Sequence, residues 1–411
     1  MGSSKRGYKS ICVPFASEAE YQQCLADDER FRGHLQLALA LHPELFPAGM
    51  GAGFKFHGFV RSKKRPGFKL RRIRLKDENQ SAYQIRPSFM LPYLMGTVAE
   101  VEKALYLLKW EVPFGALTYV FGRNDMFWYR AYLALGRNSL VGTTVKDAAQ
   151  LPAHLVADEK HTWLSGQKVY VASTAAQGCI LGASLTASAG TPDLTRAYGE
   201  FQAEAQQLNP TYEPVTVNTD GWTATQQAWK SLFPKIVIIW CFLHAWLKIR
   251  DRCQTIKALY GTVKEKVWHV YQAQTVSQFS QRIRRLREWT MGHVPVALVQ
   301  KSLLKLCSKA PAFKLAYAYP GAYRTSNALD RLMNYQDRVL YGMQYFHGSH
   351  QSAWLYLRSM ALIWNFHPYG KRTRSQNPDR HSPFKDLNGF CYVENWLENL
   401  LIAASMAGHH G

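Results

Sequence analysis

Three aspartates stand where regular elements are expected to end or begin. Asp158 lies at the end of a predicted strand, residues 154–159, and Asp220 directly follows a second predicted strand. Asp330 lies in the first turns of a predicted helix, inside the segment Arg324–Arg331. A single aspartate at a strand end is commonly only a turn former or a helix cap. Together, however, acids held at strand ends and at a helix start can converge in one cleft.

Such a set of acids suits phosphodiester chemistry. Cleaving or exchanging a phosphodiester at neutral pH needs an activated oxygen nucleophile and charge relief on the leaving oxygen. Two divalent ions about 3.5–4 Å apart supply both, and Mg²⁺ or Mn²⁺ prefers carboxylate oxygens. The sequence therefore predicts that Asp158, Asp220 and Asp330 bind two Mg²⁺ or Mn²⁺ ions. Asp337, on the same face of the predicted helix as Asp330, and Glu288 are rivals for the third position.

A Cys-x-x-His motif follows the next predicted strand. It consists of Cys241 and His244, with Phe242 and Leu243 between them. A structural zinc site would need a second pair of ligands at matching spacing, and the sequence offers none. The pair is either a buried cysteine with a histidine that merely lies near the cleft, or it has a function beside the acids.

The elements around these residues predict an α/β fold. Three strands in a meander (154–159, 167–173 and 179–185), then strands at 214–219 and 235–241 separated by helices, suggest a mixed sheet covered by helices. Helical periodicity from 246 to 312 predicts an all-α insertion, and residues 317–368 are again helical. The expected divisions are an N-terminal region with a basic β-hairpin (1–96), a helical DNA-binding region (97–150), the sheet domain (151–245 and 313–370), the insertion (246–312) and a C-terminal tail (371–411), with a loop at 370–383.

The charge points to a polyanionic partner. The chain has 50 Lys and Arg against 29 Asp and Glu, a net charge of +21. An excess of this size favours nucleic acid, with an anionic membrane surface as the second candidate. The basic hairpin at 53–76 has nine Lys or Arg between Arg61 and Lys76 and no acid; it is either a phosphate-binding edge or a solvated one. The residues expected to contact DNA are Arg61, Lys63, Lys64, Arg65, Lys69, Arg71, Arg72, Arg123, Arg130, Arg284, Arg285 and Arg331.

Residues 97–141 predict three short helices. Thr97 and Glu100 form a capping box, Pro113 opens the second helix, and Asn124 can cap the third. Three short helices with glycine-containing turns fit a helix-turn-helix-like DNA-binding region. A small helical bundle without DNA contact is the alternative.

The pattern resembles the DDE transposases of bacterial insertion sequences, and more narrowly their Mutator and hAT-type branch. The resemblance rests on Cys241-Phe-Leu-His244, on Thr325-Ser-Asn-Ala-Leu-Asp-Arg331, and on the segment from Asp158 to Gly166. It implies an RNase H-like catalytic domain, two metal ions, and a DNA transposase that binds terminal repeats and both cleaves and joins strands. It also implies that His244 contacts the scissile phosphate or orients an acid. One departure is the third acid, which is usually Glu in the family and is Asp330 here.

The resemblance also implies the setting of the protein. We expect double-stranded DNA, both transposon ends and target, as the partner, and a dimer or larger assembly on that DNA. We expect a bacterial cytoplasmic protein associated with the nucleoid and no membrane association. The alternatives are an inactive, co-opted DNA-binding protein and an RNase H-like nuclease that cuts without joining.

Overall fold

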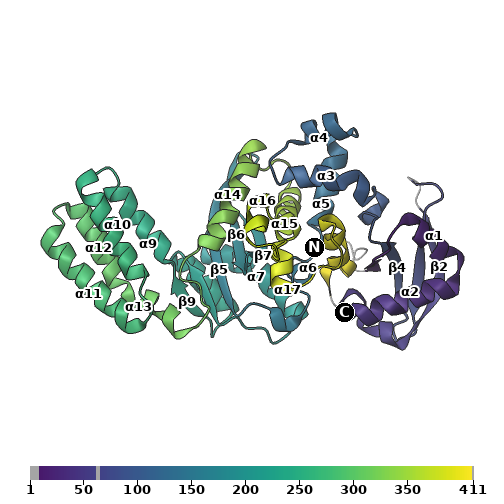
Figure 1. Ribbon diagram of the computed structural model, residues 1–411, viewed down its shortest axis with the longest axis horizontal. Coiled ribbons are helices and arrows are strands. Elements are labelled where there is room, and N and C mark those ends of the chain that lie inside the picture. Colours follow the sequence, from purple (N-terminus) through teal and green to yellow (C-terminus); the bar gives the residue numbers. More distant parts are fainter. Residues whose placement is uncertain (1–8, 62–64, 410–411) are drawn as a thin grey trace.

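The protein is mixed α/β, with two mixed sheets and a separate helical body (Figure 1). The computed structural model describes residues 9–61 and 65–409. In Figure 1 the helical body lies at one end, the five-stranded sheet in the middle and the four-stranded sheet at the other end. Short 3₁₀ helices lie at Pro43–Leu45, Ala48–Ala52, Pro92–Leu94, Ala148–Gln150, Leu315–Ala318 and Ser405–Gly408.

The central sheet has the strand order β7-β6-β5-β8-β9. Its strands are β5 (His154–Leu164), β6 (Gln167–Ala176), β7 (Cys179–Thr186), β8 (Thr216–Thr219) and β9 (Val237–Trp240). β5, β6 and β7 form an antiparallel meander, while β8 pairs parallel with β5, and β9 with β8. Two-residue turns with positive φ, each ending in glycine, join the meander, as tight hairpins require. The predicted meander and the two later strands are confirmed, with one correction. β5 continues to Leu164 in its pairing with β6, five residues beyond the predicted end at 159, so Asp158 lies in the middle of the strand and not at its end.

Helices cover both faces of this sheet. On one face, α7 (Thr191–Leu208) and α8 (Thr223–Leu232) share a hydrophobic core with Leu155 and Ala157 of β5. On the other face, α14 (Asn327–Gly342) and α15 (His350–Phe366) share a core with Val156. Since side chains alternate along a strand, Asp158 belongs to the face covered by α14.

The helical body follows β9 without a linker. It contains α9 (Phe242–Cys253), α10 (Lys257–Tyr271), α11 (Val276–His293), α12 (Ala297–Ser308) and α13 (Ala310–Lys314). These helices enclose a core of their own, built on Trp246, Val267, Phe279 and Leu303 among others. The predicted all-α character of residues 246–312 is confirmed.

The N-terminal hairpin is part of a larger sheet. The predicted strands are present as β2 (Phe54–Arg61) and β3 (Lys69–Leu75), but β1 (Ser10–Val13) and β4 (Ala82–Pro87) complete a four-stranded sheet in the order β1-β4-β3-β2. Two helices, α1 (Glu18–Ala26) and α2 (Asp28–Leu41), precede β2 in the chain and pack on the same core. Sequence reasoning missed β1 and β4.

The three predicted helices after this sheet are confirmed as α3 (Val98–Leu108), α4 (Phe114–Phe121) and α5 (Asp125–Leu135). The Thr97 capping box and the Asn124 cap are both formed. These helices share one hydrophobic core with the N-terminal sheet and with α14 and α15. They are therefore built into the main body of the protein.

The C-terminal segment is folded, so the expectation of a loop and tail there is wrong. It forms α16 (Lys371–Gln376), α17 (Pro383–Asn388) and α18 (Trp396–Ala403). The α18 side chains are largely buried. Ser405 accepts a hydrogen bond from the Cys12 amide (3.0 Å) and donates one to the Leu45 carbonyl (2.6 Å). The segment thus closes the N-terminal sheet.

Lys146, just after α6 (Leu140–Thr144), provides a test of this C-terminal packing. Its buried ammonium donates to the Ala403 carbonyl (2.7 Å), and burial lowers its pKa to about 7. Between that pKa and about 10.4, the value in the unfolded chain, unfolding takes up a proton, so stability must rise with pH. We expect wild type to gain about 2 kcal/mol of unfolding free energy from pH 7 to 9 relative to Lys146→Met, measured by urea unfolding. Equal pH slopes for the two proteins would contradict this assignment.

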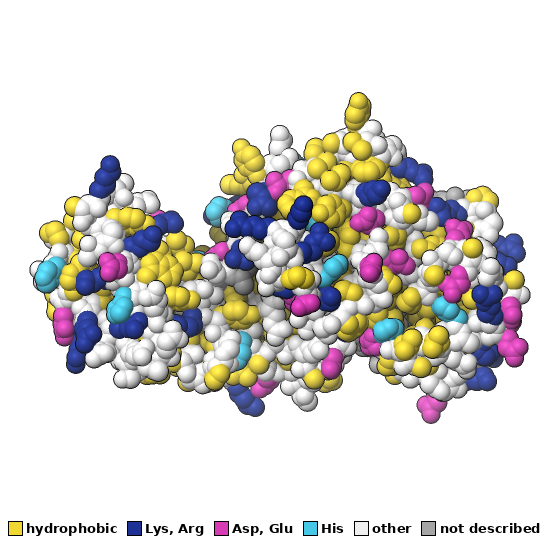
Figure 2. Space-filling model, viewed as in Figure 1, with side chains coloured by type: hydrophobic (Ala, Val, Ile, Leu, Met, Phe, Trp, Pro, Cys, Tyr) yellow, Lys and Arg dark blue, Asp and Glu magenta, His cyan; other side chains and the backbone are white. Residues whose placement is uncertain are grey.

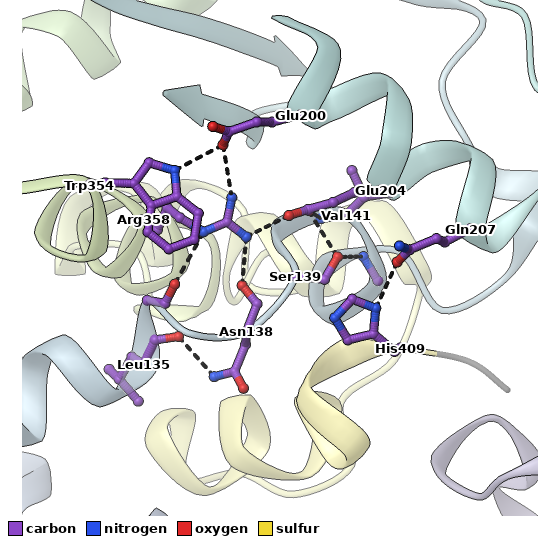
Figure 3. Close-up of polar contacts among 12 residues, drawn as sticks. Leu135, Asn138, Ser139, Val141, Glu200, Glu204, Gln207, Trp354, Arg358 and His409 are labelled. Carbon is purple, nitrogen blue, oxygen red and sulfur yellow. Dashed lines mark hydrogen bonds and ion pairs between the residues drawn. The ribbon is translucent and has the colours of Figure 1, made fainter. Parts of the chain in front are cut away.

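A buried arginine joins three segments of the chain (Figure 3). Arg358 of α15 is 4% exposed. Its guanidinium donates to the carbonyls of Gly136 (3.1 Å) and Asn138 (2.7 Å) and pairs with Glu204 of α7 (2.5 Å). Glu200, one turn earlier in α7, lies 3.8 Å from the same guanidinium. The charge is thus fully surrounded by acceptors, as a buried ion requires.

Candidate active site

Asp158, His244 and Asp330 come together although they are far apart in the chain. One potential ligand atom from each residue lies within 4.8 Å of the others. The His244 Nε2 atom is 3.7 Å from Oδ2 of Asp158. The three residues come from β5, from the first turn of α9 and from the first turn of α14. A strand and two helix starts therefore fix the cluster.

Asp158 is held rigidly on the central strand. Its side chain is almost completely buried, and its Oδ1 atom accepts a hydrogen bond from the Glu159 amide (2.9 Å). Burial raises the pKa of Asp158 to about 6; His244 opposes this shift, and the charge of Asp220 adds to it. A buried carboxyl with a raised pKa is typical of functional sites.

Asp220 directly follows β8, the strand that neighbours β5. β5 and β8 are parallel and pair Val156 with Asn218, so Asp158 and Asp220 both lie two residues beyond that pair. The charge of Asp220 acts on the pKa of Asp158 and of His244. Its Oδ1 atom accepts the Trp222 amide hydrogen (2.7 Å). Asp220 is therefore next to the cluster, while the three atoms within 4.8 Å of one another belong to Asp158, His244 and Asp330.

Of the three candidates for the third acid, Asp330 is the one at the cluster. Its carboxylate oxygens lie 3.4 and 3.5 Å from the Ser326 hydroxyl. Asp337, two turns further along α14, forms an ion pair with Lys160. Glu288 lies on α11 in the helical body, exposed and 3.7 Å from Arg284.

The Cys-x-x-His motif links two elements of the site. Cys241 precedes α9, and its sulfur accepts a hydrogen bond from the Ser326 amide (3.2 Å) just before α14. Burial lowers the pKa of His244, but Cys241, Asp158 and Asp220 outweigh this effect and raise the pKa to about 9. Burial would raise the pKa of the Cys241 thiol, yet interaction with His244 lowers it overall. The motif thus positions His244 and the start of the Asp330 helix together.

One residue at the site and one directly behind it were not predicted as participants. Ser326 contacts both Cys241 and Asp330; the only signal for it was its place in the segment that resembles the transposases. Glu159 points to the opposite face from Asp158, as side-chain alternation implies. There it accepts hydrogen bonds from Tyr198 and Thr225, each 2.7 Å long, and burial raises its pKa to about 7.

The residues predicted to contact DNA differ in their surroundings. Arg71 is the clearest correction: it is 6% exposed, forms an ion pair with Asp28 and lies 3.9 Å over the Phe56 ring, so it cannot reach a ligand. Arg72, next to it, is partly exposed because neighbours in a strand face opposite ways. Lys63 and Lys64 lie outside the described residues. Exposed on the surface are Arg61, Arg123, Arg130, Arg284, Arg285 and Arg331.

Several of the predicted DNA contacts already have partners within the protein. Arg65 and Arg123 both pair with Glu100, at 2.9 and 3.1 Å. The Lys69 ammonium lies 4.3 Å over the Phe59 ring. Such partly exposed pairs are weak, so they leave these cations able to exchange partners.

The chain matches no protein-family model and no curated protein. None of the helices in residues 9–61 and 65–409 combines the length and the apolar character that a membrane span needs.

Proposed function

We propose that this protein is a metal-dependent enzyme that cleaves and joins DNA strands, of the DDE transposase type. Asp158, Asp220 and Asp330 hold two Mg²⁺ or Mn²⁺ ions, and His244 contacts the scissile phosphate or orients an acid. The observation that carries the proposal is the convergence of Asp158, His244 and Asp330 within 4.8 Å, with Asp220 in register beside Asp158.

The architecture supports an RNase H-like interpretation of the sheet domain. One acid lies on the central strand β5, and a second follows the neighbouring parallel strand β8. The helical body then separates these strands from α14, which carries the third acid. This is the order of parts that the resemblance to DDE transposases implies. The net charge of +21 supports a polyanionic substrate.

The donor set fits the proposed ions. Carboxylate oxygens are the preferred ligands of Mg²⁺ and Mn²⁺. Two ligand atoms on opposite sides of one Mg²⁺ are about 4.2 Å apart, since each bond is about 2.1 Å long. The ligand atoms of Asp158 and Asp330 lie within 4.8 Å of each other, so each would need an inward shift of only about 1 Å or less to share an ion.

Each residue then has a distinct task. Bound ions would activate the attacking oxygen and stabilise charge on the leaving oxygen. Asp158 offers a fixed carboxylate from a buried strand, and Asp220 a more exposed one at the rim. His244, which faces Asp158, can hold or release a proton beside the reacting phosphate or steady the Asp158 carboxylate.

Binding of Mn²⁺ tests the site without any DNA. We expect wild type to bind Mn²⁺, measured by loss of the free-ion signal in electron paramagnetic resonance. Asp158→Asn or Asp330→Asn should weaken binding by about tenfold or more, because each removes a charged ligand worth at least about 1.4 kcal/mol. Asp337→Asn is the matched control, since it changes an acid of the same helix that pairs with Lys160 instead.

Equal Mn²⁺ affinity in wild type and Asp158→Asn would contradict the proposal. Joining is tested separately, by incubating the protein with DNA that carries the ends of its element and with a target plasmid. Strand-transfer products support a transposase, whereas cleavage without joining would identify a nuclease. DNA binding without either product would identify a DNA-binding protein.

A further inference from the structure

Three lysines of the helical body form a cluster in which Lys248 and Lys305 lie near Lys309, and Lys309 lies near Asp220. Lys248 lies in α9, one helical turn beyond His244. Lys305 is in the last turn of α12, and Lys309 follows directly after that helix. The two helices pack against each other. None of these lysines was among the residues that the sequence singled out.

A chain of contacts connects this lysine cluster with the candidate active site. The Lys309 ammonium lies 4.2 Å from the centre of the Trp240 ring, at the end of β9. The same ring would lie 3.4 Å from a Cβ atom placed on Gly221, the residue after Asp220. Trp240 therefore lies between Lys309 and the residue that follows Asp220, which places Lys309 at the edge of the candidate site that faces the helical body.

The positive charge of the cluster is not neutralised by nearby acids. Among the residues that the structure describes, none of the three lysines takes part in an ion pair. Burial lowers the pKa of Lys309, and the charges of Lys305 and Lys248 lower it further, while Asp220 raises it. An anionic ligand would relieve the repulsion that Lys248 and Lys305 exert on the Lys309 ammonium.

We propose that Lys248, Lys305 and Lys309 bind successive phosphates of a DNA strand as it passes from the active site onto the helical body. The proposal rests on the function proposed above and names where its substrate lies. A strand that carries a phosphate on every nucleotide can engage three cations on two helices and still reach the acids. A single small anion could contact only some of the three lysines, and the charge of Asp220 would repel it.

Binding of DNA in the absence of divalent metal tests this cluster, because no cleavage then occurs. Fluorescence anisotropy of a labelled duplex is measured across a range of salt concentrations for wild type, Lys248→Gln/Lys305→Gln/Lys309→Gln and a matched control. The control is Lys257→Gln/Lys264→Gln/Lys266→Gln, which removes the same charge from exposed lysines of α10. The logarithm of the binding constant falls as the logarithm of the salt concentration rises. We expect this slope to be less steep by about 2.7 in the first triple variant, because each phosphate contact contributes about 0.9. The control and a triple Lys→Arg variant of the cluster should keep a slope close to that of wild type.

The outcomes separate this inference from the proposed function. If the cluster variant and the α10 control variant make the slope less steep by the same amount, the effect comes from net charge alone and the inference is wrong. The inference also fails if the cluster variant binds DNA like wild type, even when wild type cleaves DNA with metal; in that case the proposed function stands. Tighter binding of RNA than of DNA by wild type, lost in the cluster variant, would overturn the assignment to DNA. If wild type binds Mn²⁺ but no nucleic acid, both proposals fail.

Discussion

Asp158→Asn is expected to abolish metal-dependent DNA cleavage, lowering the rate by about 10³-fold or more. The carboxylate is buried beside His244 and Asp330, where charge stabilisation by a bound ion is worth several kcal/mol. A loss of about 4 kcal/mol corresponds to roughly 10³-fold in rate. Asparagine keeps the shape of the side chain, so the loss reports charge rather than packing. The measurement is nicking of supercoiled plasmid, or of DNA that carries element ends, in Mn²⁺ or Mg²⁺.

The control variant, Asp337→Asn, tests whether loss of any acid near the site lowers the cleavage rate. Asp337→Asn removes an acid from the helix of Asp330 but only a partly exposed ion pair with Lys160, so its cleavage rate should remain within about threefold of wild type, as weak pairs allow. DNA binding without metal should be preserved in both variants. If Asp158→Asn cleaved at the wild-type rate, the site proposed here would be wrong.

Arg358→Ala is expected to cause the largest loss of stability. It removes a buried cation and leaves two backbone carbonyls and one carboxylate oxygen of Glu204 without their partner in a water-poor space (Figure 3). Breaking a buried pair in this way costs about 3–5 kcal/mol. We expect urea unfolding to show a loss of that size.

Arg196→Ala is the matched control for this variant. Arg196 lies on α7, as Glu204 does, but its side chain is 80% exposed and pairs with Asp193 only one turn away. Its removal should change the unfolding free energy by about 0.5 kcal/mol or less. Equal losses for the two arginines would show that the buried network adds nothing to stability.

The sequence was a good guide to the strands that carry the first two acids. Asp158 and Asp220 are side by side as predicted, because β5 and β8 run parallel and pair Val156 with Asn218. The predicted strand end at Asp158 is wrong, since the hairpin with β6 extends β5 to Leu164, and this length depends on a partner strand that the segment itself does not reveal.

The sequence could not decide between Asp330 and Asp337. Both lie on one face of a helix, seven residues apart, and the position of α14 along β5 alone determines which one meets Asp158 and which one meets Lys160.

Other predictions failed for related physical reasons. A run of basic residues in a strand alternates between two faces, so Arg71 is buried against Phe56 while its neighbour is not. Which face is covered depends on α2, whose Asp28 pairs with Arg71 but is distant in sequence. The lysine cluster was missed because its members come from two helices whose packing the sequence does not specify.

Ser405 and α18 have a practical consequence for anyone who divides this protein into pieces. The first strand of the N-terminal sheet takes a hydrogen bond partner from the far end of the chain, and α18 contributes its apolar side chains to the same core. A ribosome would thus have to complete almost the whole polypeptide before that strand is covered. A recombinant fragment of the first 150 residues would present bare apolar surface and aggregate, and DNA binding should be assayed on the intact chain.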